Sequence, residues 1–440
     1  MAVTSEIGRL RRVLIHRPGP EVEEMTPATA RELLYNEIVP VAAVQREHDQ
    51  VRRVLSLVAE TLELEDSLRS VAASLEGRNR IAELLAVGNI ETLRRLQERW
   101  SEASPEAVVR DCVLGFERVP RRLQDLVAGD RYETPPLPNL YFTRDAGFVV
   151  HHRAYRSAMA SPVRSAEAAL TAAVLESLGF PVDQTLAFAD GADTKTSSAA
   201  AAKEKAGTGR LGDPGAFKVE GGDVLVLGDY LALIGLGERS SAAGIDALLQ
   251  AMGHNRDKAF TAVVVQLPTE RATIHLDMVA TVIDHGVLLA YEPLVGGSAV
   301  APVFEVTIPA GGGEWTIREH GNLMRALGAL GRPHDIVACG GKDPVTRQRE
   351  QWFSACNSVA LAPGVIVAYQ NNPATLDALS SAGFSVLSGD EVLADPRLLV
   401  QDSGELQSGR IAVAVPGVEL ARGGGGPRCM TLPIEREEER

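Results

Sequence analysis

The sequence is poor in the residues that build metal and redox centres. Aromatic residues make up only 5% of its 440 residues, so the core must rest on Ala, Val and Leu. The nine histidines form no clustered ligand set, and we therefore expect no bound metal. The four cysteines lie far apart and form no CxxC pair of the zinc-finger or thioredoxin kind: Cys112, Cys339, Cys356 and Cys429.

Three further absences restrict where the protein works. No run of about 18 apolar residues occurs that would span a membrane, and the first residues lack the apolar stretch of a signal peptide. The formal net charge of -14 leaves no surplus of Lys and Arg for phosphate groups, which argues against general nucleic-acid binding. We expect a cytoplasmic protein, without membrane or nucleic-acid partners, whose cysteines stay reduced.

Short β-branched runs alternate with helical periodicity along most of the chain, which predicts an α/β protein. A helical period extends over 28–60, with a break at Pro40, and recurs over 90–100. Eight runs bounded by Gly, Pro or Asp predict strands at 12–16, 148–150, 224–227, 230–235, 262–266, 287–291, 365–369 and 411–415.

Two segments depart from this alternation. Residues 65–129 are rich in Leu, Arg, Glu and Ala, which predicts a mostly helical insertion without strands. Residues 192–215 are rich in Ala, Gly, Lys, Ser and Thr, which predicts a long surface loop. This loop is either a plain linker, the favoured interpretation, or a lid over an active site.

Reactive side chains gather in five short motifs, at 138–145, 219–224, 235–241, 274–277 and 422–431. In the last of these, four glycines and a proline let the backbone at Cys429 approach a ligand closely. Arg422 and Arg428 beside it would favour the thiolate, so Cys429 is a candidate nucleophile. The alternative is a loop that is merely flexible.

The acids and the histidine of the other motifs each have a structural and a catalytic interpretation. His275 and Asp277 would share one face of an extended strand, as a general acid/base and a cation anchor or as a surface pair. Glu220 and Asp223 can hold a histidine, bind a metal or cap a turn. Together with Cys429 these side chains suit covalent chemistry at a cationic carbon.

Taken in order, the motifs resemble those of arginine deiminases, in the guanidine-modifying superfamily. The resemblance runs from SEIGRLRRVLIHRPG through PLPNLYFTRD, VEGGDV, LIGLGERSS, IHLDMV and REQW to GPRCMTLP. It implies a pseudo-fivefold α/β propeller of ββαβ-type units around a central site. The chain would then be a single catalytic domain, 1–440, with the helical insertion at 65–129.

The resemblance also assigns roles to individual residues. Five match the nucleophile, the general acid/base, the carboxylate paired with that histidine, and the two acids that hold the guanidinium: Cys429, His275, Glu220, Asp145 and Asp277. Three match positions that grip the α-amino and α-carboxylate groups of arginine: Asn139, Arg164 and Arg239. The implied reaction is hydrolysis of L-arginine to L-citrulline and ammonia through a cysteine thiouronium, without a metal or an organic cofactor. A homo-oligomer is a further expectation.

Two departures from the family pattern leave the identity of the substrate undecided. Family members commonly carry Asp-Asp-Gly-Asn-Asn after REQW, where this chain has residues 353–358, and often an arginine where it has Gly424. The alternatives are an amidinotransferase or a hydrolase for another guanidino compound, and a non-catalytic arginine-binding protein.

Overall fold

A computed structural model describes residues 1–35, 37–86, 89–117, 123, 132–184, 217–253, 258–297, 301–311 and 313–438. The loop expected at 192–215 lies outside the described residues. None of the described helices combines the length and the apolar character needed to cross a lipid bilayer.

Five of the sheets formed by the described residues share one plan: two antiparallel strands, then a helix, then a strand parallel to the second. The first unit contains β5 (Gly147–Val150), β6 (Arg153–Arg156), α8 (Ser165–Ser177) and β7 (Val182–Asp183). The second contains β8 (Val224–Gly228), β9 (Leu231–Leu236), α11 (Ala242–Gly253) and β10 (Phe260–Gln266), and β13 (Val303–Ile308) and β14 (Thr316–His320) extend its sheet.

The third and fourth units follow in the same order. The third contains β11 (Ala280–Asp284), β12 (Val287–Ala290), α12 (Glu292–Val295), α13 (Leu323–Ala329) and β15 (Asp335–Ala338). Helix α14 (Pro344–Trp352) then leads to the fourth, which contains β16 (Val359–Ala362), β17 (Val365–Tyr369), α15 (Pro373–Ser381), β18 (Phe384–Ser388), α16 (Gly389–Ala394) and β19 (Arg410–Val415). In that sheet β19 lies between β17 and β18, parallel to both.

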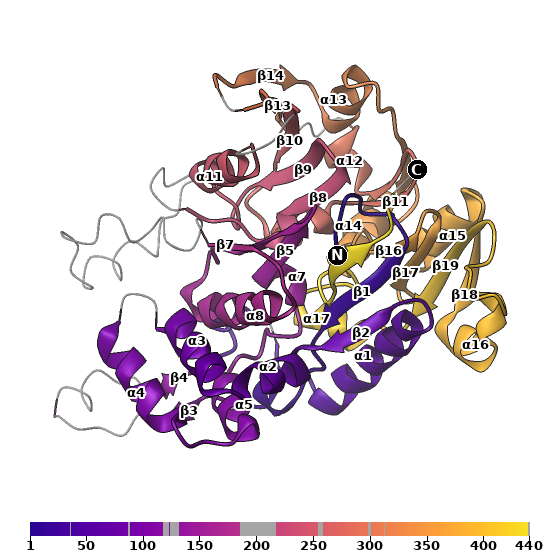
Figure 1. Cartoon of the computed structure of the whole chain (residues 1–440). Helices are drawn as coiled ribbons and strands as arrows, with labels where there is room; N and C mark the ends of the chain where they lie inside the picture. Colours follow the sequence, from indigo (N-terminus) through magenta and orange to yellow (C-terminus); the bar gives the residue numbers. More distant parts are fainter. Residues whose placement is uncertain are drawn as a thin grey trace.

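The fifth unit joins the two halves of the sequence. Its first strand is β20 (Leu432–Arg436), which follows α17 (Val418–Gly423) and pairs antiparallel with β1 (Leu10–Ile15). The chain continues through α1 (Val41–Ser56) to β2 (Glu60–Glu63), which is parallel to β1. Figure 1 shows the yellow β20 beside the indigo β1.

The mixed α/β class is confirmed, and each of the eight expected strands is present within a residue or two at its ends. Strand β10 shows why these runs predict strands, because its apolar residues are buried in succession and do not alternate with exposed ones. Such continuous apolar runs are typical of strands that are covered on both faces. The expected helix at 28–60 is wrong in part, since 28–34 forms turns and residue 60 begins β2. Pro40 caps α1 instead of breaking a longer helix.

The segment 65–129 is largely helical where it is described. It contains most of α2 (Leu64–Ala72) together with α3 (Leu75–Leu85), α4 (Ile90–Trp100) and α5 (Pro105–Val113). Their apolar faces share one hydrophobic cluster with α8, in which Trp100 and Leu170 are buried. The expectation that this segment has no strand is wrong, because β3 (Phe116–Glu117) pairs with β4 (Tyr132–Thr134).

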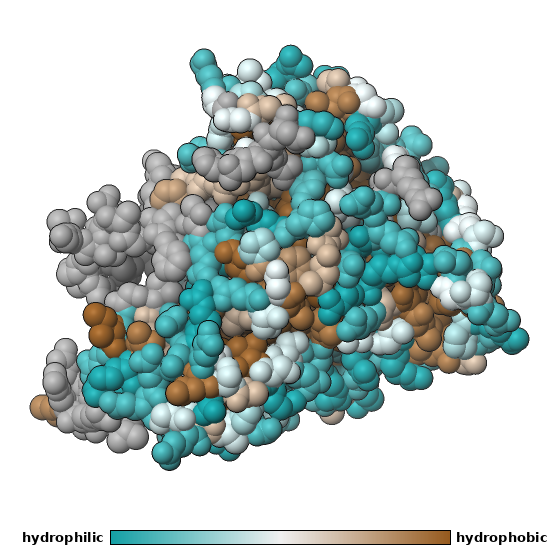
Figure 2. All heavy atoms as spheres, in the orientation of Figure 1, coloured by the Kyte–Doolittle hydropathy of each residue, from teal (hydrophilic) through white to brown (hydrophobic). Residues whose placement is uncertain are grey.

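On the face drawn in Figure 2, hydrophilic side chains predominate and hydrophobic ones form separate small patches. Exposed large apolar residues are spread over several elements, among them Ile90, Ile317 and Trp352. Single exposed apolar residues of this kind are ordinary for a folded protein.

Candidate active site

The polar motifs meet at one buried cavity with a volume of about 30 Å³. Four of the five contribute to its wall directly, and Glu220 of the remaining motif binds the histidine in that wall. The wall is formed by Leu34, Asn139, Phe142, Asp145, Arg164, Arg239, Arg271, Ile274, His275, Met278, Gly423, Gly424 and Cys429. A thiol, an imidazole and a carboxylate therefore face the same small space.

His275 is held between two carboxylates. Its Nε2 lies 2.9 Å from Oε2 of Glu220, and its Nδ1 lies 3.6 Å from Oδ1 of Asp145. Burial alone would lower the pKa of His275, but Asp145 and Glu220 outweigh it and raise the pKa to about 9. The imidazole is therefore protonated at neutral pH and can donate a proton. Gly222 makes room for it, since a Cβ there would lie 2.7 Å from the ring.

Glu220 is fully buried and is held by three groups. One carboxylate oxygen accepts from the backbone N–H of Ala160 at 2.8 Å and lies 3.5 Å from Nη1 of Arg239. Burial would raise the pKa of Glu220, but Arg239 and His275 lower it. The histidine thus has an ionised partner, which fixes its orientation.

Asp145 and Asp277 are arranged alike, because one carboxylate oxygen of each accepts a hydrogen bond from a buried arginine. Oδ2 of Asp145 accepts from Arg164 at 2.6 Å, and Oδ2 of Asp277 accepts from Arg428 at 2.8 Å. The other oxygen of each carboxylate is buried without a hydrogen bond from any described residue. A buried acceptor left unpaired is costly, and because Asp145 lines the cavity its Oδ1 can receive a ligand with N–H donors, whereas Asp277 does not line the cavity.

The thiol of Cys429 lies beside one of these acids, with 3.8 Å between its Sγ and Oδ2 of Asp277. Burial raises the pKa of Cys429 well above its ordinary value, and Asp277 and Asp145 raise it further. The sequence-based expectation of a thiolate promoted by Arg422 and Arg428 is therefore wrong. Arg428 turns to Asp277 and Glu6, while Arg422 pairs with Glu419 nearer the surface.

Asn357 fastens the cysteine loop, and sequence reasoning missed it. It is completely buried, its Oδ1 accepts from the backbone N–H of Cys429 at 3.0 Å, and its Nδ2 donates to the carbonyl of Asp277 at 3.3 Å. It belongs to the segment 353–358, which stands out in the sequence only for the acids that it lacks. Its position directly before a strand was the available signal.

His275 and Asp277 do not share a strand face, contrary to expectation. His275 is extended, but Leu276–Met278 forms a short 3-10 helix, η6. This turn is held by Asp223, whose Oδ1 accepts from the N–H of Leu276 at 2.8 Å and whose Oδ2 accepts from Ser240 at 2.6 Å. Of the interpretations open for the 219–224 motif, Glu220 holds a histidine and Asp223 secures a turn.

The three residues matched to the amino-acid end of a substrate lie at the same cavity. Asn139 donates from Nδ2 to the carbonyl of Leu33 at 2.9 Å. Arg164 is engaged with Asp145 and also with Glu167, at 2.8 Å from Nε. Arg239 differs, since its buried Nε and Nη1 have no hydrogen-bond partner among the described residues. Arg239 is thus equipped to receive an anion.

Asp145, Glu220 and His275 are the described residues with the geometry for a metal ion, because one ligand atom from each lies within 4.8 Å of the others. Arg164 and Arg239 already supply positive charge to these two carboxylates. His275 is protonated at neutral pH, and a protonated imidazole has no free lone pair to offer a metal ion. The group therefore lacks one of the three ligands that a metal would need.

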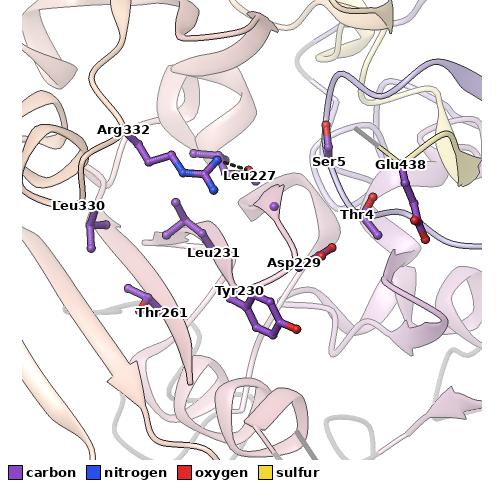
Figure 3. A pocket seen from close by; sticks show the side chains of 11 residues that line it. Thr4, Ser5, Leu227, Asp229, Tyr230, Leu231, Thr261, Leu330, Arg332 and Glu438 are labelled. Carbon is purple, nitrogen blue, oxygen red and sulfur yellow. Dashed lines mark hydrogen bonds between the residues drawn. The ribbon is translucent and has the colours of Figure 1, made fainter. Parts of the chain in front are cut away.

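A larger pocket of about 430 Å³ lies elsewhere, between the start of the chain and the turn from β8 to β9. Figure 3 shows Arg332 extending across it toward Leu227, with Thr4 and Ser5 on the other side. Its wall contains neither a cysteine nor a histidine. The thiol of Cys429 and the imidazole of His275 thus do not line this larger pocket.

Raising the pH is expected to weaken the fold through His275. The pKa of this histidine is raised from 6.5 to about 9 on folding, so its contribution to stability is complete below 6.5 and is lost as the pH rises through about 9. The unfolding free energy should fall more between pH 7 and pH 9 in the parent protein than in His275→Gln. Urea unfolding of both at several pH values measures this, and parallel pH curves would contradict it.

Comparison with known proteins identifies a family and relatives for the whole chain. The family model described as arginine deiminase matches residues 31–182 and 201–436. An arginine deiminase of Rhodococcus erythropolis is 31% identical over 469 residues, which cover 99% of this chain and 98% of that protein. One of Listeria monocytogenes is 28% identical over 451 residues, with 99% and 97% covered.

Two solved structures share the fold alone. SxtG, an amidinotransferase from Microseira wollei, aligns with a TM-score of 0.52 at 10% identity and covers 100% of this chain and 98% of its own. Unliganded AgrE aligns with a TM-score of 0.52 at 14% identity, over 97% of this chain and 40% of that longer one. The match of the family model over most of the sequence, with relatives of 30% and 31% identity along its length, shows that the chain belongs to the arginine deiminase family.

Proposed function

We propose that this protein hydrolyses L-arginine to L-citrulline and ammonia through a covalent intermediate on Cys429. The observation that carries the proposal is the buried Oδ1 of Asp145, which accepts no hydrogen bond from a described residue, at the cavity that Cys429 and the protonated His275 also line. Asp277 does not line this cavity but lies beside the sulfur, with 3.8 Å between its Oδ2 and Sγ of Cys429. A guanidinium is planar and presents N–H donors in a fixed fork, which suits two carboxylates. Its positive charge also offsets the cost of burying them.

Substrate binding prepares the nucleophile. In the empty cavity burial and two carboxylates favour the thiol form of Cys429. A guanidinium held by Asp145 with Asp277 nearby neutralises the field that raises this pKa, so the thiol proton passes to solvent and the thiolate forms against the cationic carbon. The nucleophile is then active only when its substrate is in place.

The reaction proceeds in two halves. The Cys429 thiolate attacks the guanidinium carbon, His275 donates a proton to one terminal nitrogen, and the C–N bond breaks to release ammonia. The remaining thiouronium is attacked by water, from which the now neutral His275 removes a proton. The C–S bond then breaks, citrulline leaves, and the sulfur is restored. Glu220 keeps the imidazole oriented throughout.

The amino-acid end of the substrate lies toward Asn139, Arg164 and Arg239. The Nε of Arg239, which is buried without a hydrogen bond to a described residue, supports a contact with the α-carboxylate. Asn139 and Arg164 line the same side of the cavity and supply further polar groups. These three residues would distinguish an arginine from a bare guanidinium.

We further infer that the five units surround the cavity as a pseudo-fivefold propeller, in one domain of residues 1–440 with 65–129 inserted. Support comes from where each unit delivers a residue to the site. The segment just before the first strand of each unit carries, in chain order, Asp145, Glu220, His275, Asn357 and Cys429. Such recurrence is what a repeated unit around a common axis would produce.

The test is to incubate the purified protein with L-arginine alone and to measure citrulline and ammonia. Equal amounts of both are expected, without any added amine. An amidinotransferase would need an acceptor amine and would release no ammonia. Absence of citrulline, together with turnover of another guanidino compound, would show that this other compound is the substrate. The altered segment 353–358 is the feature of the sequence that favours this alternative.

A further inference from the structure

Arg271 occupies the entrance to the reaction cavity. Two wider cavities, of about 320 Å³ and 960 Å³, lie outside it, and Arg271 lines all three. The middle one also shares Ile274, Met278 and Gly424 with the reaction cavity, and it shares Ala272 and Trp352 with the outer one. The three cavities thus adjoin one another, and a substrate that enters along them must pass the guanidinium of Arg271.

The charge of Arg271 is not neutralised by an ion pair. Within the described part of the chain no carboxylate lies within 4.0 Å of its guanidinium, whereas the neighbouring Arg164 and Arg422 each have carboxylate partners. Half-burial lowers the pKa of Arg271, and the positive charge of Arg239 lowers it further. Two cationic groups therefore stand close together at this end of the cavity, and one of them has buried N–H donors without partners.

Among the described residues, the guanidinium of Arg271 makes one hydrogen bond, to a main-chain carbonyl. Its Nη2 donates to the carbonyl of Leu34 at 2.6 Å. Leu34 has a φ of +68°, in the left-handed region that bulky side chains rarely adopt. A carboxylate would accept a stronger, charge-assisted bond from the same guanidinium. The contact with Leu34 is thus one that an anionic ligand can displace.

Gly424 leaves the space that the guanidinium of Arg271 uses. Its φ is +109°, and a Cβ built there would lie 3.7 Å from Nη2 of Arg271. A longer side chain at this position would extend toward that group and would also strain the backbone. This chain has Gly424 where the family often has an arginine, and the guanidinium of Arg271 lies near that position instead.

We propose that Arg271 binds the α-carboxylate of the substrate together with Arg239, and that it exchanges the carbonyl of Leu34 for that carboxylate when substrate enters. The inference rests on the proposed function and adds to it a selection for guanidino acids over guanidino amines. A substrate that lacks the carboxylate gains nothing from Arg271, because its own positive end would face two guanidinium groups.

The experiment compares arginine with agmatine, which is arginine without its carboxylate, in the parent protein and in Arg271→Gln. KM for arginine should rise by about 10- to 100-fold, the loss expected for one hydrogen bond to a charged group, with kcat changed far less. The inhibition constant of agmatine against arginine should stay the same or fall. Arg271→Lys should recover part of the loss in KM, because it keeps the charge.

Arg349→Gln is the matched control, since Arg349 lines only the outer cavity. It should leave both constants as in the parent protein. An unchanged KM in Arg271→Gln, or equal weakening of arginine and agmatine, overturns the inference while leaving arginine hydrolysis intact. Failure of the parent protein to release citrulline is a separate result, which overturns the proposed function itself.

Discussion

Replacement of Cys429 by alanine should abolish citrulline formation, with kcat reduced by at least about 10³-fold, the scale on which loss of a covalent nucleophile acts. The substituted side chain removes only the sulfur, whose nearest recorded polar contact is Asp277 at 3.8 Å. Folding and arginine binding should persist, because the two unpartnered acid oxygens remain. Citrulline release after rapid mixing with arginine measures the first effect, and calorimetric titration with arginine measures the second.

Cys356→Ser serves as the control for this result. Cys356 is completely buried in a hydrophobic cluster and lines no part of the reaction cavity. Its burial raises the pKa of the thiol well above the ordinary value, so it stays protonated and unreactive. The variant should lose some stability through its buried hydroxyl but keep most of its activity. Substantial citrulline formation by Cys429→Ala, or loss of citrulline formation in Cys356→Ser, would show that Cys429 is not the nucleophile.

The second large effect is expected at Arg428. Its guanidinium is buried and binds both oxygens of Glu6 at 3.1 Å, Asp277 at 2.8 Å and the carbonyl of Val224 at 2.8 Å. Arg428→Met would leave two buried carboxylates without their cation, which typically costs about 3–5 kcal/mol of unfolding free energy. Denaturant unfolding, monitored by circular dichroism, measures the loss.

Arg422→Met provides the comparison from the same loop. Arg422 also forms ion pairs, but its side chain is 36% exposed and one partner, Glu37, is 61% exposed. Its loss should change the unfolding free energy by less than about 1 kcal/mol. Equal effects of the two substitutions would contradict the role given to burial. Recovery of stability in a Glu6→Gln, Arg428→Met double variant would show how much of the loss comes from the unpaired Glu6.

Local patterns in the sequence were sufficient to predict eight of the strands and the helical character of 65–129. The strand at Val365–Tyr369 and the helix at Ile90–Trp100 have the predicted bounds, because the apolar run of one and the apolar period of the other are set by near neighbours. The helical period was taken back to residue 28 although its apolar positions lie beyond Pro40, and tertiary contacts such as the bond from Asn139 to Leu33 hold the turns at 28–34 in another conformation.

The site was predictable in its residues but not in its ion pairs. Cys429, His275 and Glu220 were recognised from motif and resemblance, and they do come together. The partner of Arg428, in contrast, is Glu6, which is 422 residues away in the chain, and no local pattern connects them. The charge state expected for Cys429 failed because burial, Asp277 and Asp145 together outweigh Arg428, which does lower the pKa of the thiol.

The closing pair of strands has a consequence for how the protein is made. Among the five segments that furnish the cavity, the one with the sulfur is the last to be synthesised, and the strand behind it must return to the first strand of the chain. A growing polypeptide on the ribosome therefore carries its acids and its imidazole long before it carries Cys429, the nucleophile that we propose. Under the proposed mechanism, reaction with arginine, a building block of the same synthesis, cannot begin before this last segment has been made.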